Sequence, residues 1–434
     1  MQLSSDSYVI FESVTPLDQQ VFGLVLNREA FVPATLSAQL DSFFAELILS
    51  RLALDTKAYT TALGNVNFNS VVDSIVDLFD SSLRYVAKND KWSHGGREVF
   101  RQQVGSFVSR GAKVEFCLPA FPCKSSSKNK VLSDSPDRGE HIALSNLHTF
   151  IQKIEAVYPP GGKLWIISDG HVFSDCIGVD DMTVDKYGAR LKAMNKSIAD
   201  SRGGKDRIGF KSLPDLFGIE SQGSFGHLHR IKEHLPETTR YIGTKTTDEA
   251  DLCRKVLTMG FRPGNDELQE LISVKDAALL ALYRGFSRFM LEDLATNRYT
   301  SHLSRAQLKK RSAKVAKEMI QRNQCYSNLV QMLFPNHVRL SIHAHDNSGP
   351  KFGIQMLGKG VVPTDVFPPN ATTVDFCDQL QVPTPWHNCI VQVEGHSELY
   401  ITKASAIWPA IRAGDAKLVR DGDAGEYVYF KGCK

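Results

Sequence analysis

The chain lacks several features that would place it in a specialised class of protein. No run of about eighteen apolar residues is free of charge, so we expect no membrane-spanning helix. Its eight cysteines form no C-x-x-C pair or zinc-finger spacing, which predicts reduced, mostly buried thiols and no structural zinc site. The 51 basic and 48 acidic residues leave a net charge of only +3, which favours neither nucleic acid nor a membrane surface as a partner. Any site for an anionic ligand must therefore be local.

The first twenty residues lack the basic start and apolar core of a secretory signal, so we expect a cytoplasmic protein. What is present is an ordinary globular composition, with 42% hydrophobic and 23% charged residues over 434 residues. This length suits one large domain with an attached lobe, or two to three ordinary domains. Residues 34–54 and 68–87 carry apolar residues at helical spacing, which predicts an N-terminal helical lobe over residues 1–90.

Beyond this lobe, strand patterns alternate with helix patterns. Residues 112–121 and 163–168 read as apolar strands, and residues 140–158 between them read as a helix that Pro159 and Pro160 end. A strand, a helix and a second strand form one βαβ unit, with parallel strands and a right-handed crossover.

The last hundred residues are typical of antiparallel hairpins. The strictly alternating residues 337–345 turn through "DNSGP" into 351–357, and residues 388–394 turn through Gly395 into 397–404. The fold class is therefore α/β, a mixed sheet with a βαβ unit and C-terminal antiparallel hairpins, flanked by helices. It becomes α+β if the hairpins form a sheet of their own.

The stretch "WIISDGHVFSDCIGVDD", residues 165–181, ends an apolar strand in a cluster of ionisable groups. Ligands bind outside the carboxyl ends of parallel strands, so Asp169 and Asp175 are candidates for acid and base work, with Ser168 and His171 beside them. Gly170 suits a turn at this point. The alternative is that Asp169 or Ser168 caps a short helix and the other side chains are solvated.

The strand at 337–345 presents a second set of polar side chains. With a period of two, Arg339, His343 and His345 share one face, where they could hold an anion and move protons. A half-exposed strand with a solvated face is the simpler alternative. His343 and His345, followed by Asp346, also suit a metal in an iron-dependent oxygenase, although the spacing departs from the usual facial triad.

Three further positions suit a binding site. Arg284 and Arg288 lie one helical turn apart, a pattern that suits a phosphate or carboxylate, or else ion pairs with nearby acidic residues. Trp386 and His387 follow two prolines and suit a pocket wall, or else a core tryptophan beside a surface histidine. Lys124 follows the first strand and is either an anion contact or a surface lysine.

Five motifs of the chain, in this order and spacing, resemble the pyoverdine/dityrosine biosynthesis family, whose bacterial and fungal members include isocyanide (isonitrile) synthases. The motifs are "LPAFPCKSSSKNKVL", "ISDGHVFSDCIGVDD", "LYRGFSRFMLEDL", "RLSIHAHDNSGPKFGIQML" and "PTPWHNCIVQV". The resemblance implies a catalytic domain over residues 91–405, with residues 406–434 as a C-terminal extension.

The resemblance also implies a reaction. The α-amino nitrogen of an L-amino acid of the valine, tyrosine or tryptophan class becomes an isocyanide, a secondary-metabolite group whose carbon comes from C2 of ribulose 5-phosphate. No cofactor or metal is implied, and a downstream oxygenase or other tailoring enzyme is a possible partner for the product. The alternative within the family is an enzyme that forms N-formyl tyrosine for spore-wall dityrosine.

This chemistry requires a cationic cradle for the ketose phosphate and groups that transfer protons. The candidates for the cradle are Lys124, Arg284, Arg288 and Arg339. The candidates for proton transfer are Asp169, Asp175, His343 and His387. Ser168, His345 and Trp386 complete the predicted substrate contacts, together with His171, where family members commonly have arginine. A non-catalytic sugar-phosphate-binding scaffold is the remaining hypothesis, besides the iron-dependent oxygenase.

Overall fold

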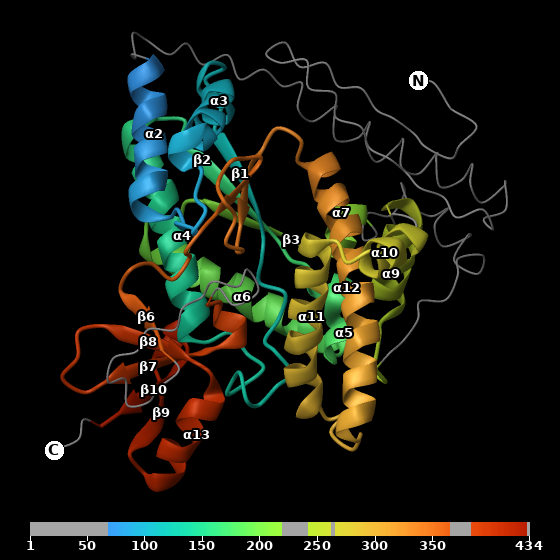
Figure 1. Ribbon diagram of the computed structural model, residues 1–434. Coiled ribbons are helices and arrows are strands. Elements are labelled where there is room, and N and C mark those ends of the chain that lie inside the picture. Colours follow the sequence, from blue (N-terminus) through green and yellow to red (C-terminus); the bar gives the residue numbers. More distant parts are fainter. Residues whose placement is uncertain (1–67, 219–241, 262–264, 365–382, 432–434) are drawn as a thin grey trace.

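The computed structural model describes residues 68–218, 242–261, 265–364 and 383–431 (Figure 1). The expected helix at residues 34–54 lies outside them, as does most of the expected N-terminal lobe. The expected helix at residues 68–87 is confirmed as α2 (Phe68–Ser82). In the described part of the chain, no helix combines the length and the hydropathy needed to cross a bilayer.

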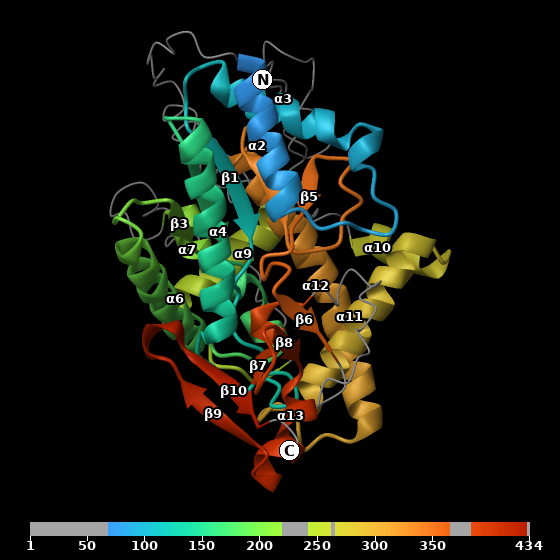
Figure 2. The same cartoon turned by 90° about the vertical axis from the view of Figure 1, so that its left-hand side faces the viewer.

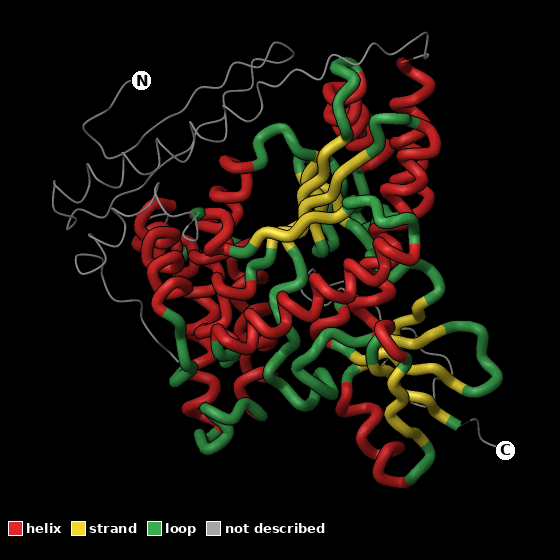
Figure 3. Tube along the Cα trace, turned by 180° about the vertical axis from the view of Figure 1, so that it is seen from behind, coloured by secondary structure: helices red, strands yellow, loops and turns green. Residues whose placement is uncertain are grey.

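Five parallel strands form the central sheet, in the order β3-β2-β1-β4-β5. Figure 3 draws the strands in yellow among the red helices. They are β1 (Val114–Pro119), β2 (Gly162–Ile167), β3 (Ile208–Lys211), β4 (Val338–Ser341) and β5 (Lys351–Gly353). Helices cover both faces, so successive strand residues enter different cores: Phe116 and Leu118 join one, and Cys117 joins the other.

The first core packs the sheet against helices that include α2, and Figure 2 shows α2 and α4 on this side of β1. Its other helices are α3 (Gly96–Val108), α4 (Arg138–Val157) and α6 (Asp181–Ser201). The second core is formed with α5 (Gly170–Ile177), α7 (Leu213–Phe217), α9 (Asp248–Phe261), α11 (Ala277–Ala295) and α12 (Arg305–Leu333). The short helices η1 (Trp92–His94) and α10 (Asn265–Ser273) complete this part of the chain.

The βαβ unit is confirmed, because α4 connects the parallel neighbours β1 and β2. A capping box starts α4: the Asp137 carboxylate accepts from Gly139 N, and the Glu140 carboxylate accepts from Asp137 N. The helix ends at Val157, before the two prolines.

The hairpin expected at residues 337–357 is wrong. Strand β4 ends at Ser341, and β5 lies parallel to it, with Arg339 opposite Lys351. The connection doubles back because Asn347, at φ 56°, donates to Tyr85 O and Asp90 Oδ1 and accepts from Gly353 N. Alternation in a sequence indicates which residues share a face, but not the direction of the next strand.

The second sheet contains the C-terminal strands and is mixed, in the order β6-β8-β7-β10-β9. They are β6 (Val361–Pro363), β7 (Cys389–Val393), β8 (Leu399–Thr402), β9 (Ala416–Arg420) and β10 (Glu426–Phe430), accompanied by η4 (Pro385–His387), α13 (Ala404–Ala413) and η5 (Gly422–Ala424). The hairpin expected at residues 388–404 is confirmed as the antiparallel pair β7–β8. Because β10 pairs with β7, the expected boundary at residue 405 falls within this sheet.

Candidate functional site

Asp169 lies immediately beyond the carboxyl end of β2, where α5 begins. It occupies the N-cap position of α5, but its side chain makes no capping hydrogen bond, so the capping alternative is wrong for this side chain. Its Oδ1 is buried and has no hydrogen-bond partner among the described residues. Burial raises the pKa of this carboxyl from 3.8 to about 6. Asp169 is therefore a partly buried acid whose Oδ1 is an unused, buried acceptor and whose pKa is close to neutrality.

The glycine after Asp169 is required by packing. A Cβ at Gly170 would lie 2.2 Å from Pro122 O and 2.6 Å from Val184 Cγ1. Gly170 was expected to form a turn, but it is the first residue of α5 and its φ is not positive. The close approach of the segment that follows β1 explains this glycine instead. Ser168 Oγ also connects the end of β2 with the segment that follows β1, because it donates a hydrogen bond to Phe121 O at 3.1 Å.

Two cationic side chains meet on the face of the sheet that α12 covers. Arg339 of β4 is only 8% exposed and donates to Ser327 Oγ at 3.1 Å. Lys351, its neighbour on β5, donates to the same Ser327 Oγ at 3.1 Å. Arg339 also reaches Ser327 O and Gln331 Oε1, both at 3.3 Å. Their partners within the described residues are thus neutral oxygens of α12.

Because no carboxylate in the described part of the chain balances these charges, the pair lacks a counter-charge there. Burial lowers the pKa of Arg339. Burial, together with the charge of Arg339, lowers the pKa of Lys351 from 10.5 to about 8. A buried and a partly buried cation without a counter-charge among the described residues favour an anion as ligand. We call Arg339, Lys351 and Ser327 the cationic cluster.

Tyr326 connects the cationic cluster to the end of β2. Its hydroxyl donates to Ile167 O at 2.9 Å. Burial and the nearby charge of Asp169 raise the pKa of this hydroxyl well above 10.0, while the charge of Arg339 opposes that shift. Asp169 and Arg339 therefore both lie within electrostatic range of one buried tyrosine.

His343 and His345 follow the end of β4, so the strict alternation expected along residues 337–345 does not continue to them. Their ring centroids are 6.3 Å apart. Burial, followed by the charges of His343 and Lys351, lowers the pKa of His345 to about 4, so its imidazole is neutral at pH 7. These two histidines border the cationic cluster.

Asp346, whose carboxylate was expected to complete a metal triad, has other partners. Asp346 pairs with Lys91 at 2.9 Å and accepts from Ser348 Oγ at 2.7 Å. Within the part of the chain that the structure describes, no three histidine, cysteine or acidic side chains form a group that could hold a metal ion. The residues expected for an iron-dependent oxygenase are therefore not assembled by the described structure.

Asp175 lies on α5, within a network of arginines. Its carboxylate accepts two hydrogen bonds from Arg322 of α12, at 2.6 and 3.0 Å, and is 4.0 Å from Arg254 of α9. Burial opposes ionisation, but the charges of the two arginines hold the pKa of Asp175 below 3.8. This geometry occupies the carboxylate and joins three helices, which favours a structural role. His171 on the same helix contacts Asp185 at 3.0 Å.

Lys124 is fully buried, and its ammonium has three protein acceptors. Its Nζ is 2.7 Å from Asp137 Oδ2, 2.9 Å from Glu140 Oε2 and 2.8 Å from Pro385 O. The two carboxylates outweigh burial and raise the pKa of Lys124. An ammonium has three hydrogens, so none is left for a sugar phosphate.

We expect Lys124→Met to lower the free energy of unfolding by about 3–5 kcal/mol, because it leaves two buried acids without their cation. Urea unfolding would measure the loss. Lys196→Met is the control, since Lys196 pairs with Asp200 at the surface and its removal should cost less than about 0.5 kcal/mol. A stable Lys124→Met protein that no longer binds ribulose 5-phosphate would instead support the anion contact expected from the sequence.

Trp386 and His387 lie in η4, which packs against the segment that follows β1. Trp386 is 1% exposed and packs against Phe121 with ring centroids 5.1 Å apart, as expected for a core tryptophan. His387 is edge-on to Phe289 of α11 at 4.9 Å, and its Nδ1 is 3.1 Å from Thr384 Oγ1. Burial and the charges of Lys130 and other lysines lower the pKa of His387 well below 6.5.

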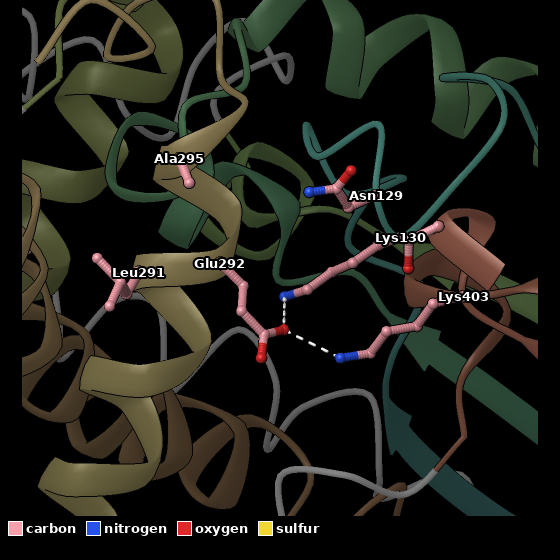
Figure 4. Close-up of a pocket in the computed structure, with 7 residues that line it drawn as sticks. Asn129, Lys130, Leu291, Glu292, Ala295 and Lys403 are labelled. Carbon is pink, nitrogen blue, oxygen red and sulfur yellow. Dashed lines mark hydrogen bonds and ion pairs between the residues drawn. The ribbon is translucent and has the colours of Figure 1, made fainter. Parts of the chain in front are cut away.

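Arg284 and Arg288 are exposed on α11, and the structure gives neither of them an ion pair within the described residues. A cavity of about 420 Å³ lies further along the same helix (Figure 4). There Glu292 lies between Lys403, at 3.0 Å, and Lys130, at 3.7 Å. Lys130 also contacts Asp293 at 2.9 Å, so opposite charges balance in this cavity, in contrast to the cationic cluster.

Comparison with known proteins identifies the family. A family model described as "Pyoverdine/dityrosine biosynthesis protein" matches residues 104–411, more than half of the chain. The chain belongs to this family. It is 39% identical over 375 residues to the spore wall maturation protein DIT1 of Saccharomyces cerevisiae, an alignment that covers 86% of this chain and 69% of DIT1.

Bacterial members of the pyoverdine/dityrosine biosynthesis family are also similar. An L-tyrosine isonitrile synthase of Xenorhabdus nematophila is 31% identical over 299 residues, which cover 69% of this chain and 74% of that enzyme. The crystal structure of PvcA from Pseudomonas aeruginosa superposes with a TM-score of 0.63 at 25% identity, and covers 84% of this chain and 100% of PvcA. The two-sheet α/β fold is therefore shared with a solved member of the family.

Sequence reasoning missed Lys351, Ser327 and Tyr326. Lys351 follows the "DNSGP" turn, but a hairpin would have placed it away from Arg339, and only the parallel register makes the two neighbours. Ser327 and Tyr326 lie on a long helix whose sequence gave no chemical signal. Arg322, the partner of Asp175, lies 147 residues away from it in the chain.

Proposed function

We propose that this member of the family is an isocyanide synthase that acts on an aromatic L-amino acid, with L-tyrosine as the first candidate. In this proposal the α-amino nitrogen receives its carbon from C2 of ribulose 5-phosphate. The observation that carries it is the cationic cluster: Arg339 is buried and Lys351 partly buried, and neither has a carboxylate partner among the described residues, as a site for a sugar phosphate requires. The tyrosine substrate of the Xenorhabdus relative supports the choice of amino acid.

The neighbouring side chains suit the proton transfers of this reaction. Imine formation at C2 and cleavage of the carbon-carbon bonds beside it require groups that take up and release protons near neutral pH. Asp169, with a pKa of about 6, can do both, whereas His345, with a pKa of about 4, stays neutral and can hydrogen-bond to the substrate. In this role Asp169 and His345 are catalytic residues, whereas Asp175 positions α5 through Arg322.

The similarity to DIT1 favours a second candidate, an enzyme that forms N-formyl tyrosine for spore-wall dityrosine. The two products are chemically close, because addition of one water molecule to an isocyanide gives a formamide. Both candidates use the same amino acid and the same site. They differ in whether water reaches the carbon before the product leaves.

A direct assay tests both candidates. The purified chain is incubated with ribulose 5-phosphate carrying carbon-13 at C2 and with tyrosine, tryptophan or valine in turn, and the products are analysed by mass spectrometry. A labelled isocyanide supports the first candidate, and labelled N-formyl tyrosine the second. If no amino acid is consumed, the non-catalytic scaffold replaces both. A requirement for added iron would instead support the oxygenase.

Two arginine variants locate the anion site. We expect Arg339→Met to weaken the apparent affinity for ribulose 5-phosphate by about 10–100-fold, because a charge-assisted contact is lost. Arg284→Ala removes an exposed arginine on α11 and should change this affinity by less than about two-fold. Isothermal titration with ribulose 5-phosphate would measure both. The reverse order of effects would place the sugar phosphate on α11, as the paired arginines in the sequence suggested.

The product of an isocyanide synthase is a reactive group on an intact amino acid. We therefore propose a downstream oxygenase or other tailoring enzyme as a partner in the reaction sequence, if the isocyanide and not the formamide is released.

A further inference from the structure

We propose that Lys351 is a nucleophile, whose Nζ forms a ketimine with C2 of the keto sugar before the amino acid reacts. This inference rests on the proposed function, because it assigns a covalent role at the same site. It gives the two cations of the cationic cluster different tasks: Arg339 holds the anionic group of the sugar, and Lys351 activates the carbonyl.

The contacts of Lys351 differ from those of the other buried lysines. Lys124 and Lys130 each have a carboxylate oxygen within 2.9 Å of the ammonium group. Lys351 is partly buried, and within the described residues its Nζ donates a hydrogen bond to the hydroxyl of Ser327 at 3.1 Å. A single neutral acceptor orients Nζ but leaves two of its three hydrogens, or a lone pair after deprotonation, for a substrate.

The charge of Arg339 helps to increase the fraction of Lys351 that is present as the neutral amine. A lysine becomes a nucleophile when it is desolvated beside a second cation, because both effects favour loss of its proton. With a pKa of about 8 in place of 10.5, roughly a tenth of Lys351 is unprotonated at pH 7, about 300 times more than for an ordinary lysine. Arg339 cannot compete as a nucleophile, because its guanidinium stays protonated.

The step balances without an oxidant or a reductant. Neutral Nζ attacks C2, the two protons that Nζ loses are transferred to the carbonyl oxygen, and this oxygen leaves as water. The amine of the amino acid then adds to the ketimine carbon, and Nζ leaves again as an amine. The net result is the imine between amino acid and sugar, with Lys351 regenerated. The advantage is that a protonated ketimine is a better electrophile than the ketone.

Chemical trapping tests the inference on the full chain. The protein is incubated with ribulose 5-phosphate alone, treated with sodium cyanoborohydride, digested, and its peptides are mapped by mass spectrometry. We expect a reduced sugar phosphate adduct on Lys351, whose yield rises with pH through about 8. An adduct confined to other lysines, or none at all, would overturn the proposal. This result comes from the unaltered protein, so it does not depend on how any variant folds.

Matched variants separate this proposal from the proposed function. Lys351→Arg keeps the charge but cannot form an imine, so we expect no adduct, a loss in kcat of about 100-fold or more, and nearly unchanged affinity for ribulose 5-phosphate. Lys359→Arg, at an exposed lysine nearby, should match the wild type. Product from the wild type without an adduct, or full turnover by Lys351→Arg, would remove the ketimine and leave the proposed function intact. Absence of both product and adduct would remove both.

Discussion

Replacing Asp169 by asparagine should reduce turnover by about 10²–10⁴-fold while making the folded protein more stable at neutral pH. The loss of turnover follows from removal of a proton-transfer group whose pKa of about 6 suits acid and base work at pH 7. The gain in stability follows from burial, because a carboxylate with an unpartnered oxygen is costly to ionise inside the protein. A residue that serves the fold would show the opposite change in stability.

The pH dependence of this gain follows from linkage. The folded pKa of Asp169, about 6, lies above its unfolded value of 3.8, so the folded state holds its proton to higher pH. Below about pH 4 the carboxyl is protonated in both the folded and the unfolded state, so it does not lower the free energy of unfolding. Between about pH 4 and 6 the wild type loses stability relative to Asp169→Asn, and above pH 6 the full difference of about 1–3 kcal/mol is present.

Urea unfolding of the wild type and of Asp169→Asn at pH 4.5 and 7.5 measures this difference, and the product assay measures turnover. Asp415→Asn applies the same change to an exposed aspartate and should alter neither quantity. Retained turnover in Asp169→Asn would show that another group transfers the proton. A large loss of stability at pH 7.5 would mean that Asp169 has a structural partner.

Replacing Asp175 by asparagine should lower the free energy of unfolding by about 3–5 kcal/mol. The change removes the carboxylate that accepts two hydrogen bonds from Arg322, at 2.6 and 3.0 Å, and leaves this fully buried guanidinium with Glu318 as its remaining carboxylate partner. Arg322 also donates to Val172 O and Glu318 Oε1, so it cannot move to water without breaking the contact of α12 with α5. A cost of this size is a large share of the stability of an ordinary domain.

Thermal and urea unfolding would measure the loss. The control is Asp200→Asn, which breaks a surface ion pair with Lys196 and should cost less than about 0.5 kcal/mol. An Asp175→Asn protein with wild-type stability and no turnover would instead give Asp175 the catalytic role expected from its position in the "SDGHVFSD" motif.

The sequence was informative wherever a short segment determines its own structure. Apolar spacing correctly predicted the βαβ unit from β1 to β2, the helix α2 and the β7–β8 hairpin. The position of Asp169 at a strand end also followed from the sequence, because parallel strands present their carboxyl ends together. The motifs, in combination, predicted the family that the comparisons confirm.

The sequence by itself thus determined the family, most elements of the sheet, and the types of side chain near its carboxyl edge. Only the tertiary structure decided which charges are neutralised. Asp175 and Lys124 looked available but are bound by Arg322 and by Asp137 with Glu140, whereas Arg339 and Lys351 meet without a counter-charge from any residue that the structure describes. The physical reason is that ion pairing depends on contacts between segments far apart in the chain, and on the direction of β5, which Asn347 fixes through its contacts with the α2–α3 connection.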